Sequence, residues 1–162
     1  MSSYIFFRKG EKEMEQNAIY IHYGDDQLRV SDPIKNRQNI TFTKPYGGLW
    51  ASRENDPNGW KSWCESERFM LDTFDRYFRF TLKENAKVLR LIHEDQLIDL
   101  PKLHPYNHHD RSAECYLNFE MLAKEYDAIE VTNIGRLYWP LYGWDCNSIL
   151  VMNPDILQVL EE

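Results

Sequence analysis

One carboxylate near the middle of the sequence has neighbours that could give it a chemical role. Glu67 follows Trp60 and Trp63, and further apolar residues around it (Cys64, Leu71, Phe74, Phe78) recur at helical spacing. On such a helix, Glu67 falls in the middle of the apolar face. Because an unpaired buried carboxylate is costly, two explanations arise. Glu67 either forms a structural ion pair or backbone hydrogen bond, or it faces a ligand cavity where the tryptophans can stack on a flat ring.

The segment before this helix has the pattern of a turn followed by a strand. Gly47 and Gly48 allow backbone conformations that a side chain would forbid, and a short apolar run then ends at Ser52. A loop rich in Asn, Asp and Pro covers residues 54–58. The sequence predicts that the helix follows this loop and runs from Gly59 to about Phe80.

The remaining elements mix strands and helices without regular alternation. Four further segments have the β-branched or apolar content of strands, namely 18–24, 86–92, 127–131 and 148–152. A helix is expected from about Ala113 to Tyr126, and a terminal turn of helix runs through Leu160. Phosphate-binding and dinucleotide-binding glycine loops are both absent from the sequence. This order predicts one α+β domain over residues 1–162.

Composition narrows the classes of function. The 162 residues include 19 Lys and Arg against 26 Asp and Glu, for a formal charge of −7, which argues against a broad nucleic-acid surface but leaves a local basic groove open. Hydrophobic residues make up 43% and aromatic residues 14%, as in a globular domain rich in aromatic rings. Since the sequence has no long apolar run and no signal-peptide pattern, we expect a cytoplasmic protein without a membrane segment.

A cluster of potential metal ligands lies at His104, His108, His109 and Asp110. Pro105 makes a regular helix through this segment unfavourable, so the spacing does not place the ligands on one face. A solvated loop is therefore the favoured interpretation, and no metal site is assigned. Three cysteines (Cys64, Cys115, Cys146) are widely spaced and indicate neither a disulfide framework nor a zinc site.

Three short motifs occur in an informative order. The first strand ends in Ile21-His22-Tyr23-Gly24, the second contains Gly48-Leu49-Trp50-Ala51-Ser52 and precedes the helix, and the last is Ser148-Ile149-Leu150-Val151-Met152-Asn153-Pro154. Together they resemble the ADP-ribosyltransferase superfamily, whose members cleave NAD and pass ADP-ribose to an acceptor. That family has a His-Gly motif, an aromatic-and-serine motif and a Glu-x-Val-Val-x-Asn-Pro strand in this order.

The resemblance implies a fold and a set of roles. The expected core is a split, mostly antiparallel sheet with flanking helices. His22 would hold the NAD ribose, Trp50 would stack on nicotinamide and Ser52 would support the pocket. The residues implied to contact NAD are Tyr23, Gly24, Lys44, Gly48, Trp50, Ser52 and Trp63.

The third motif departs from the family at its catalytic position. Ser148 stands where the family has a glutamate, and serine fills poorly the electrostatic role of that carboxylate toward the oxocarbenium-like charge. Asp145 or Glu67 is the candidate replacement. The first hypothesis is therefore NAD-dependent transfer of ADP-ribose to a macromolecular acceptor by a small toxin or phage effector.

Two other functions stay open from the sequence. One is a non-catalytic relative that binds a nucleotide or a protein partner through its aromatic groove. The other is a metal-dependent hydrolase that uses the histidine cluster.

Overall fold

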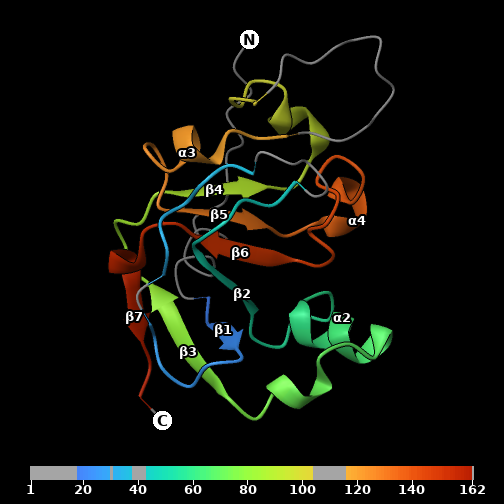
Figure 1. The fold of residues 1–162 in the computed structure, drawn as a ribbon, viewed down its shortest axis with the longest axis vertical. Coiled ribbons are helices and arrows are strands. Elements are labelled where there is room, and N and C mark those ends of the chain that lie inside the picture. Colours follow the sequence, from blue (N-terminus) through green and yellow to red (C-terminus); the bar gives the residue numbers. More distant parts are fainter. Residues whose placement is uncertain (1–17, 30, 38–42, 104–115, 162) are drawn as a thin grey trace.

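A curled, mostly antiparallel sheet of seven short strands organises the chain (Figure 1). The computed structural model describes residues 18–29, 31–37, 43–103 and 116–161. Neighbouring strands follow the order β4-β5-β6-β2-β1-β3-β7, and only the β4–β5 pairing is parallel. The strands are β1 (Tyr20–Tyr23), β2 (Leu49–Arg53), β3 (Tyr77–Leu82), β4 (Val88–Leu91), β5 (Ala128–Val131), β6 (Ser148–Val151) and β7 (Leu157–Val159).

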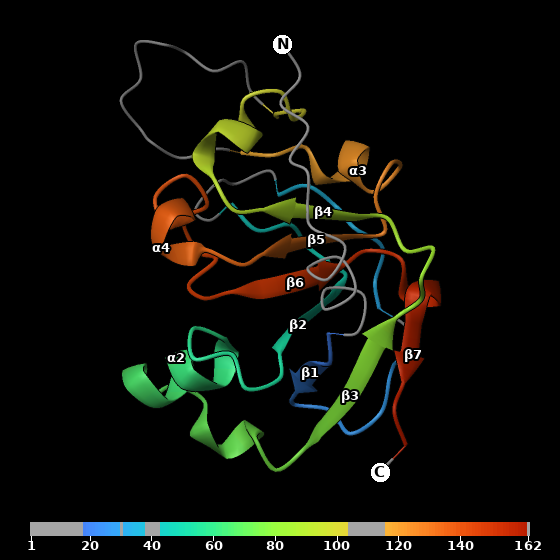
Figure 2. The same ribbon diagram turned by 180° about the vertical axis from the view of Figure 1, so that it is seen from behind.

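Helices are few and short in the described part of the chain. They are α2 (Trp60–Glu67), α3 (Phe119–Leu122) and α4 (Ile134–Leu137), with 3₁₀ turns at Leu71–Thr73, Glu94–Leu97 and Pro154–Ile156. Figure 2, the view from behind, shows α2 beside the end of β2 and α4 beside the ends of β5 and β6. The expected α+β class is therefore confirmed. None of the described helices has the length and apolar character that crossing a bilayer requires.

The sheet carries a core on each face, which explains why its central strands are mostly apolar, with Glu130 of β5 and Ser148 of β6 as buried polar exceptions. Alternate residues of β5 and β6 enter different clusters: Ile129 and Leu150 join one, whereas Ala128 and Ile149 join the other. Side chains of successive strand residues point to opposite faces, so a strand buried on both sides cannot alternate with polar residues. This double burial places β2 and β6 in the interior of the fold.

The ladder between β1 and β2 is short, and this opens the sheet near its middle. β1 pairs with β3 over four residues but with β2 at only two positions, the last being Ile21 opposite Ser52. On the other side of β2, the ladder to β6 ends at Ala51 opposite Ile149. Both ladders thus stop beside the segment from Trp50 to Ser52.

The prediction of a helix from Gly59 to Phe80 is right about the start of the helix but wrong about its end. Helix α2 ends at Glu67, because Arg68 and Met70 take left-handed backbone conformations with φ of 55° and 48°. A 3₁₀ turn follows, and residues 77–82 form strand β3, in which Phe78 and Phe80 are buried. The apolar residues that seemed to continue a helical face therefore belong to a strand.

Two smaller predictions are also wrong. The helix expected from 113 to 126 is reduced to the four residues of α3, with residues 113–115 outside the described ranges. The expected terminal helix is a 3₁₀ turn at Pro154–Ile156 followed by β7, which pairs with β3. The strands expected at 18–24, 86–92, 127–131 and 148–152 are confirmed as β1, β4, β5 and β6, and the strand that ends at Ser52 is β2.

Candidate functional site

A cavity of about 240 Å³ lies where the two ladders of β2 end. We call it the aromatic cavity, because the indole rings of Trp50 and Trp60 form part of its wall. Its described lining residues are Ile21, His22, Tyr23, Gly24, Lys44, Trp50, Ala51, Ser52, Trp60, Met70, Thr73, Cys146 and Ser148. They come from β1, β2, α2, the start of β6 and the segment after α2.

Seven of the eleven predicted site residues line this one cavity. They are His22, Tyr23, Gly24, Lys44, Trp50, Ser52 and Ser148. The sequence separates the first and last of these by more than a hundred residues, and the pairing of β2 with both β1 and β6 brings them together.

His22 lies on β1 just beyond the last position at which β1 pairs with β2, and its side chain is oriented by a hydrogen bond to β2. Its Nδ1 lies 2.7 Å from the carbonyl oxygen of Trp50, and its ring contacts Phe78 with centroids 5.2 Å apart. Since a carbonyl oxygen can only accept, Nδ1 carries the hydrogen of this bond. No hydrogen bond to Nε2 occurs within the described residues, so this nitrogen is the one that can meet a ligand.

Ser52 ties three parts of the site together. Its hydroxyl donates to the carbonyl oxygen of Asn147 at 2.9 Å and accepts from the backbone N–H of Trp60 at 2.9 Å. The second bond does the work of a helix cap, because the N-cap residue Gly59 has no side chain. A Cβ on Gly59 would lie 3.1 Å from that of Ser52, so the close approach of β2 to the helix explains this glycine. Ser52 is therefore a positioning residue whose hydrogen is already committed.

Asn147 and Ser148 form the start of β6 and are buried. The Asn147 side chain donates to Asp56 at 3.1 Å and accepts from the N–H of Ile134 at 2.9 Å, which fastens the loop before α2 and the start of α4 to this point. The Ser148 hydroxyl donates to the carbonyl oxygen of Cys146 at 3.2 Å. Asn147 was not among the predicted residues, because its partners lie far away in sequence.

Cys146 places a thiol at the wall of the aromatic cavity, but this thiol stays in its unreactive, protonated form. The pKa of this thiol is raised from 9.0 to about 12, chiefly by burial; the Lys44 charge opposes the rise and the Asp145 carboxylate adds to it. The thiol is protonated at neutral pH, and the thiolate is the reactive form of cysteine. Covalent catalysis by Cys146 is therefore disfavoured.

Lys44 and Asp145 form a charged pair at the edge of the cavity. Lys44 Nζ lies 3.5 Å from Asp145 Oδ2, and each side chain is about one-third exposed. Lys44 lines the cavity, whereas Asp145 does not. Among the described residues that line the aromatic cavity there is no Asp or Glu, so the carboxylate linked to it is that of Asp145, through its ion pair with Lys44.

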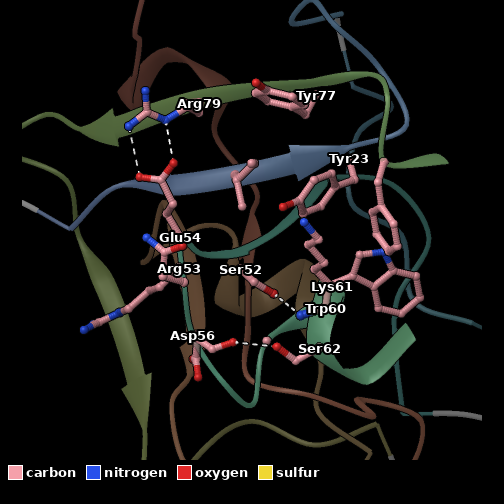
Figure 3. A pocket seen from close by; sticks show the side chains of 14 residues that line it. Tyr23, Ser52, Arg53, Glu54, Asp56, Trp60, Lys61, Ser62, Tyr77 and Arg79 are labelled. Carbon is pink, nitrogen blue, oxygen red and sulfur yellow. Dashed lines mark hydrogen bonds and ion pairs between the residues drawn. The ribbon is translucent and has the colours of Figure 1, made fainter. Parts of the chain in front are cut away.

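A second, polar cavity of about 570 Å³ adjoins the first. The two share Ile21, Tyr23, Ser52 and Trp60 as walls. Figure 3 shows the polar cavity with Arg79 bound to Glu54 on one side and Lys61 rising from α2 toward Tyr23 on the other. Burial raises the pKa of Tyr23, and Glu54 and Glu65 raise it further, so its hydroxyl is neutral and can donate or accept.

Besides Asp145, three predicted site residues line neither cavity. Glu67 is exposed at the end of α2, so the prediction that it faces a buried aromatic surface is wrong. The early end of the helix is the reason. Trp63 stacks on Trp60 with centroids 5.3 Å apart and lines neither cavity. Gly48 has φ of +73°, and a Cβ there would lie 2.6 Å from Leu150, so this glycine serves the close packing of β2 on β6.

Among the residues that the structure describes, the buried carboxylate is Glu130, which the sequence did not single out. It is 1% exposed and accepts hydrogen bonds from Arg53 Nε at 2.7 Å, Arg90 Nε at 3.1 Å and the Tyr20 hydroxyl at 3.1 Å. Burial and the Glu130 charge both raise the pKa of Tyr20. Glu130 therefore ties β1, β2, β4 and β5 together and faces neither cavity.

The predicted metal-binding alternative, with His104, His108, His109 and Asp110, lies outside the described residues. Within the ranges that the structure describes, no group of His, Cys, Asp or Glu is arranged to hold a metal ion.

Comparison of this chain with protein-family models, with curated proteins and with solved structures gave no significant match.

Proposed function

We propose that this protein binds NAD with its nicotinamide in the aromatic cavity and transfers ADP-ribose to a macromolecular acceptor. One observation carries the proposal. The three motifs that resemble the ADP-ribosyltransferases lie on β1, β2 and β6, and residues of all three line the same cavity.

The side chains suit the parts of NAD as follows. The indoles of Trp50 and Trp60 offer stacking surface to the nicotinamide ring, and His22 offers Nε2 to a ribose hydroxyl. Ser52 holds the start of α2 in place. A dinucleotide is larger than the aromatic cavity, and the adjoining polar cavity supplies further space and polar partners.

Cleavage of the glycosidic bond needs negative charge near the ribose, because positive charge develops there as nicotinamide leaves. Asp145 is the carboxylate proposed for this role, since its partner Lys44 lines the cavity. We assign no catalytic role to Glu67, which is exposed at the end of α2. Ser148, with its hydroxyl bound to Cys146, would contact the ligand as a neutral group.

A second function is favoured by the serine at the family's glutamate position. Ser148 lines the aromatic cavity, and no Asp or Glu does so among the described residues. Both features suit a protein that binds NAD or another nucleotide without cleaving it. The setting proposed with the first function, a toxin or phage effector acting in the cytoplasm, rests on the size of the chain and the resemblance only.

A proton NMR time course with NAD separates these functions. In the transferase, free nicotinamide accumulates with the wild-type protein as water accepts the ADP-ribose in place of the natural acceptor; this release is lost in Asp145→Asn and persists in Glu67→Gln, the control carboxylate outside the cavity. Broadened nicotinamide signals without release indicate the binding protein. Sharp, unchanged NAD signals in the presence of the protein contradict both functions.

A further inference from the structure

The ammonium group of Lys44 occupies the place of a cationic ligand. Its Nζ lies 5.1 Å from the centroid of the Trp50 ring, within the distance at which a cation is attracted to an aromatic face. The same atom lies 3.5 Å from Asp145 Oδ2. Trp50 and Asp145 thus form the two halves of a cation site, one aromatic and one anionic.

The described residues that line the aromatic cavity contribute no charge to this site other than that of Lys44. Among the described residues that line the aromatic cavity, Lys44 is the only lysine or arginine, and there is no Asp or Glu. Cys146 is protonated at neutral pH because burial raises its pKa to about 12. Among the described residues, the charged groups that the structure places at the face of Trp50 are therefore Lys44 and its ion-pair partner Asp145.

We propose that the aromatic cavity selects a positively charged planar ring, and that Lys44 is a specificity-determining residue that such a ring must displace. The choice of ring rests on the proposed function: the pyridinium of oxidised NAD carries the required charge, and neutral dihydronicotinamide does not. Two cations cannot share the face of Trp50, so the ring takes over the attraction of Trp50 and Asp145 while the Lys44 side chain turns toward solvent. In the free protein, Lys44 thus makes the two interactions that the cationic ring makes in the complex.

This arrangement predicts an unusual sign for a lysine substitution. If Lys44 served to bind a phosphate of the ligand, its removal would weaken binding. If Lys44 competes with the ligand's positive charge, its removal strengthens binding of a cationic ring and leaves a neutral ring unaffected. The two explanations therefore give opposite results with the same variant.

The test compares 1-methylnicotinamide, which is cationic, with nicotinamide, which is neutral, in tryptophan-fluorescence or NMR titrations at low salt. We expect Lys44→Met to bind 1-methylnicotinamide about three- to tenfold more tightly than the wild type, as the usual size of cation–π and half-exposed ion-pair interactions suggests. The affinity for nicotinamide stays within about twofold, because no charge competition exists for a neutral ring. Asp145→Asn weakens binding of the cation several-fold.

Two further variants serve as controls. Lys44→Arg keeps the competing charge and should bind the cation no better than the wild type. Lys124→Met removes an exposed lysine that lines neither cavity, and it should leave both affinities unchanged. A thermal melt of each variant verifies that it is folded.

Several results would overturn the inference: weaker or unchanged binding of 1-methylnicotinamide to Lys44→Met, an equal gain for nicotinamide, or no binding of the cation by any variant. Failure of the transferase proposal is a separate result. If Lys44→Met binds the cation more tightly but the protein never releases nicotinamide from NAD, the cation site is supported and the transfer reaction is refuted. If nicotinamide is released but Lys44→Met shows no gain in binding, the transfer reaction is supported and the role of Lys44 is refuted.

Discussion

Replacing Ser52 by alanine tests whether this serine holds the site together. The Ser52 side chain is 2% exposed, and its hydroxyl takes part in two hydrogen bonds of 2.9 Å, one to the Asn147 carbonyl oxygen and one from the Trp60 N–H. Alanine fits the same space in the strand but offers neither bond. The variant therefore isolates the hydroxyl from effects of packing.

The expected loss follows from the two groups left without their partner. The Asn147 carbonyl lies in a buried residue, and an unsatisfied buried acceptor costs about 1–3 kcal/mol. The N–H of Trp60 loses the acceptor that replaces a helix cap, which costs about 0.5–2 kcal/mol. Because water can reach the helix start from the polar cavity, we expect a total of about 1–4 kcal/mol rather than the full sum.

Urea unfolding followed by tryptophan fluorescence measures this loss, with Ser62→Ala as the matched control. The Ser62 hydroxyl donates to the Asp56 carbonyl at 3.2 Å and lies in a half-exposed residue, so its removal should change stability by about 0.5 kcal/mol or less. Binding of 1-methylnicotinamide should weaken in Ser52→Ala, because Trp60 is no longer fixed against the cavity. A loss below about 1 kcal/mol together with unchanged binding would refute the role of Ser52.

Two further predictions concern the buried polar groups. Glu130→Gln removes the buried carboxylate charge to which Arg53 and Arg90 bond, and it should lower the free energy of unfolding by about 2–3 kcal/mol once the partial exposure of both arginines is allowed for. Glu54→Gln breaks the more exposed pair with Arg79 and should cost about 1 kcal/mol or less, and equal losses in the two variants would contradict this reasoning. Stability should also fall at alkaline pH, because the folded-state pKa values of Cys146 and Tyr20 lie above their ordinary values of 9.0 and 10.0, so the unfolded chain loses these protons first. Urea midpoints that are constant below about pH 9 and then decline, with a smaller decline in Cys146→Ala, would agree with this.

The sequence predicted most strands because their signals are local. Segments such as Ala18–Gly24 and Ser148–Met152 combine β-branched or apolar residues with a terminating Gly or Asn-Pro, and these features act within a few residues. The prediction of where the helix after Gly59 ends was wrong for a related reason. Its stop depends on left-handed Arg68 and Met70, two residue types that give no local signal for that conformation.

The candidate site divides in the same way. Local sequence patterns were enough to mark the segments that carry the candidate site residues, and seven of the eleven residues predicted from them line one cavity. The three-dimensional fold was needed to show that Glu67 is exposed, that Trp60 and not Trp63 lines the cavity, and that Glu130 is buried. These outcomes depend on pairings between residues up to 110 positions apart, such as Tyr20 with Glu130, and no local pattern encodes which distant group will neutralise a charge.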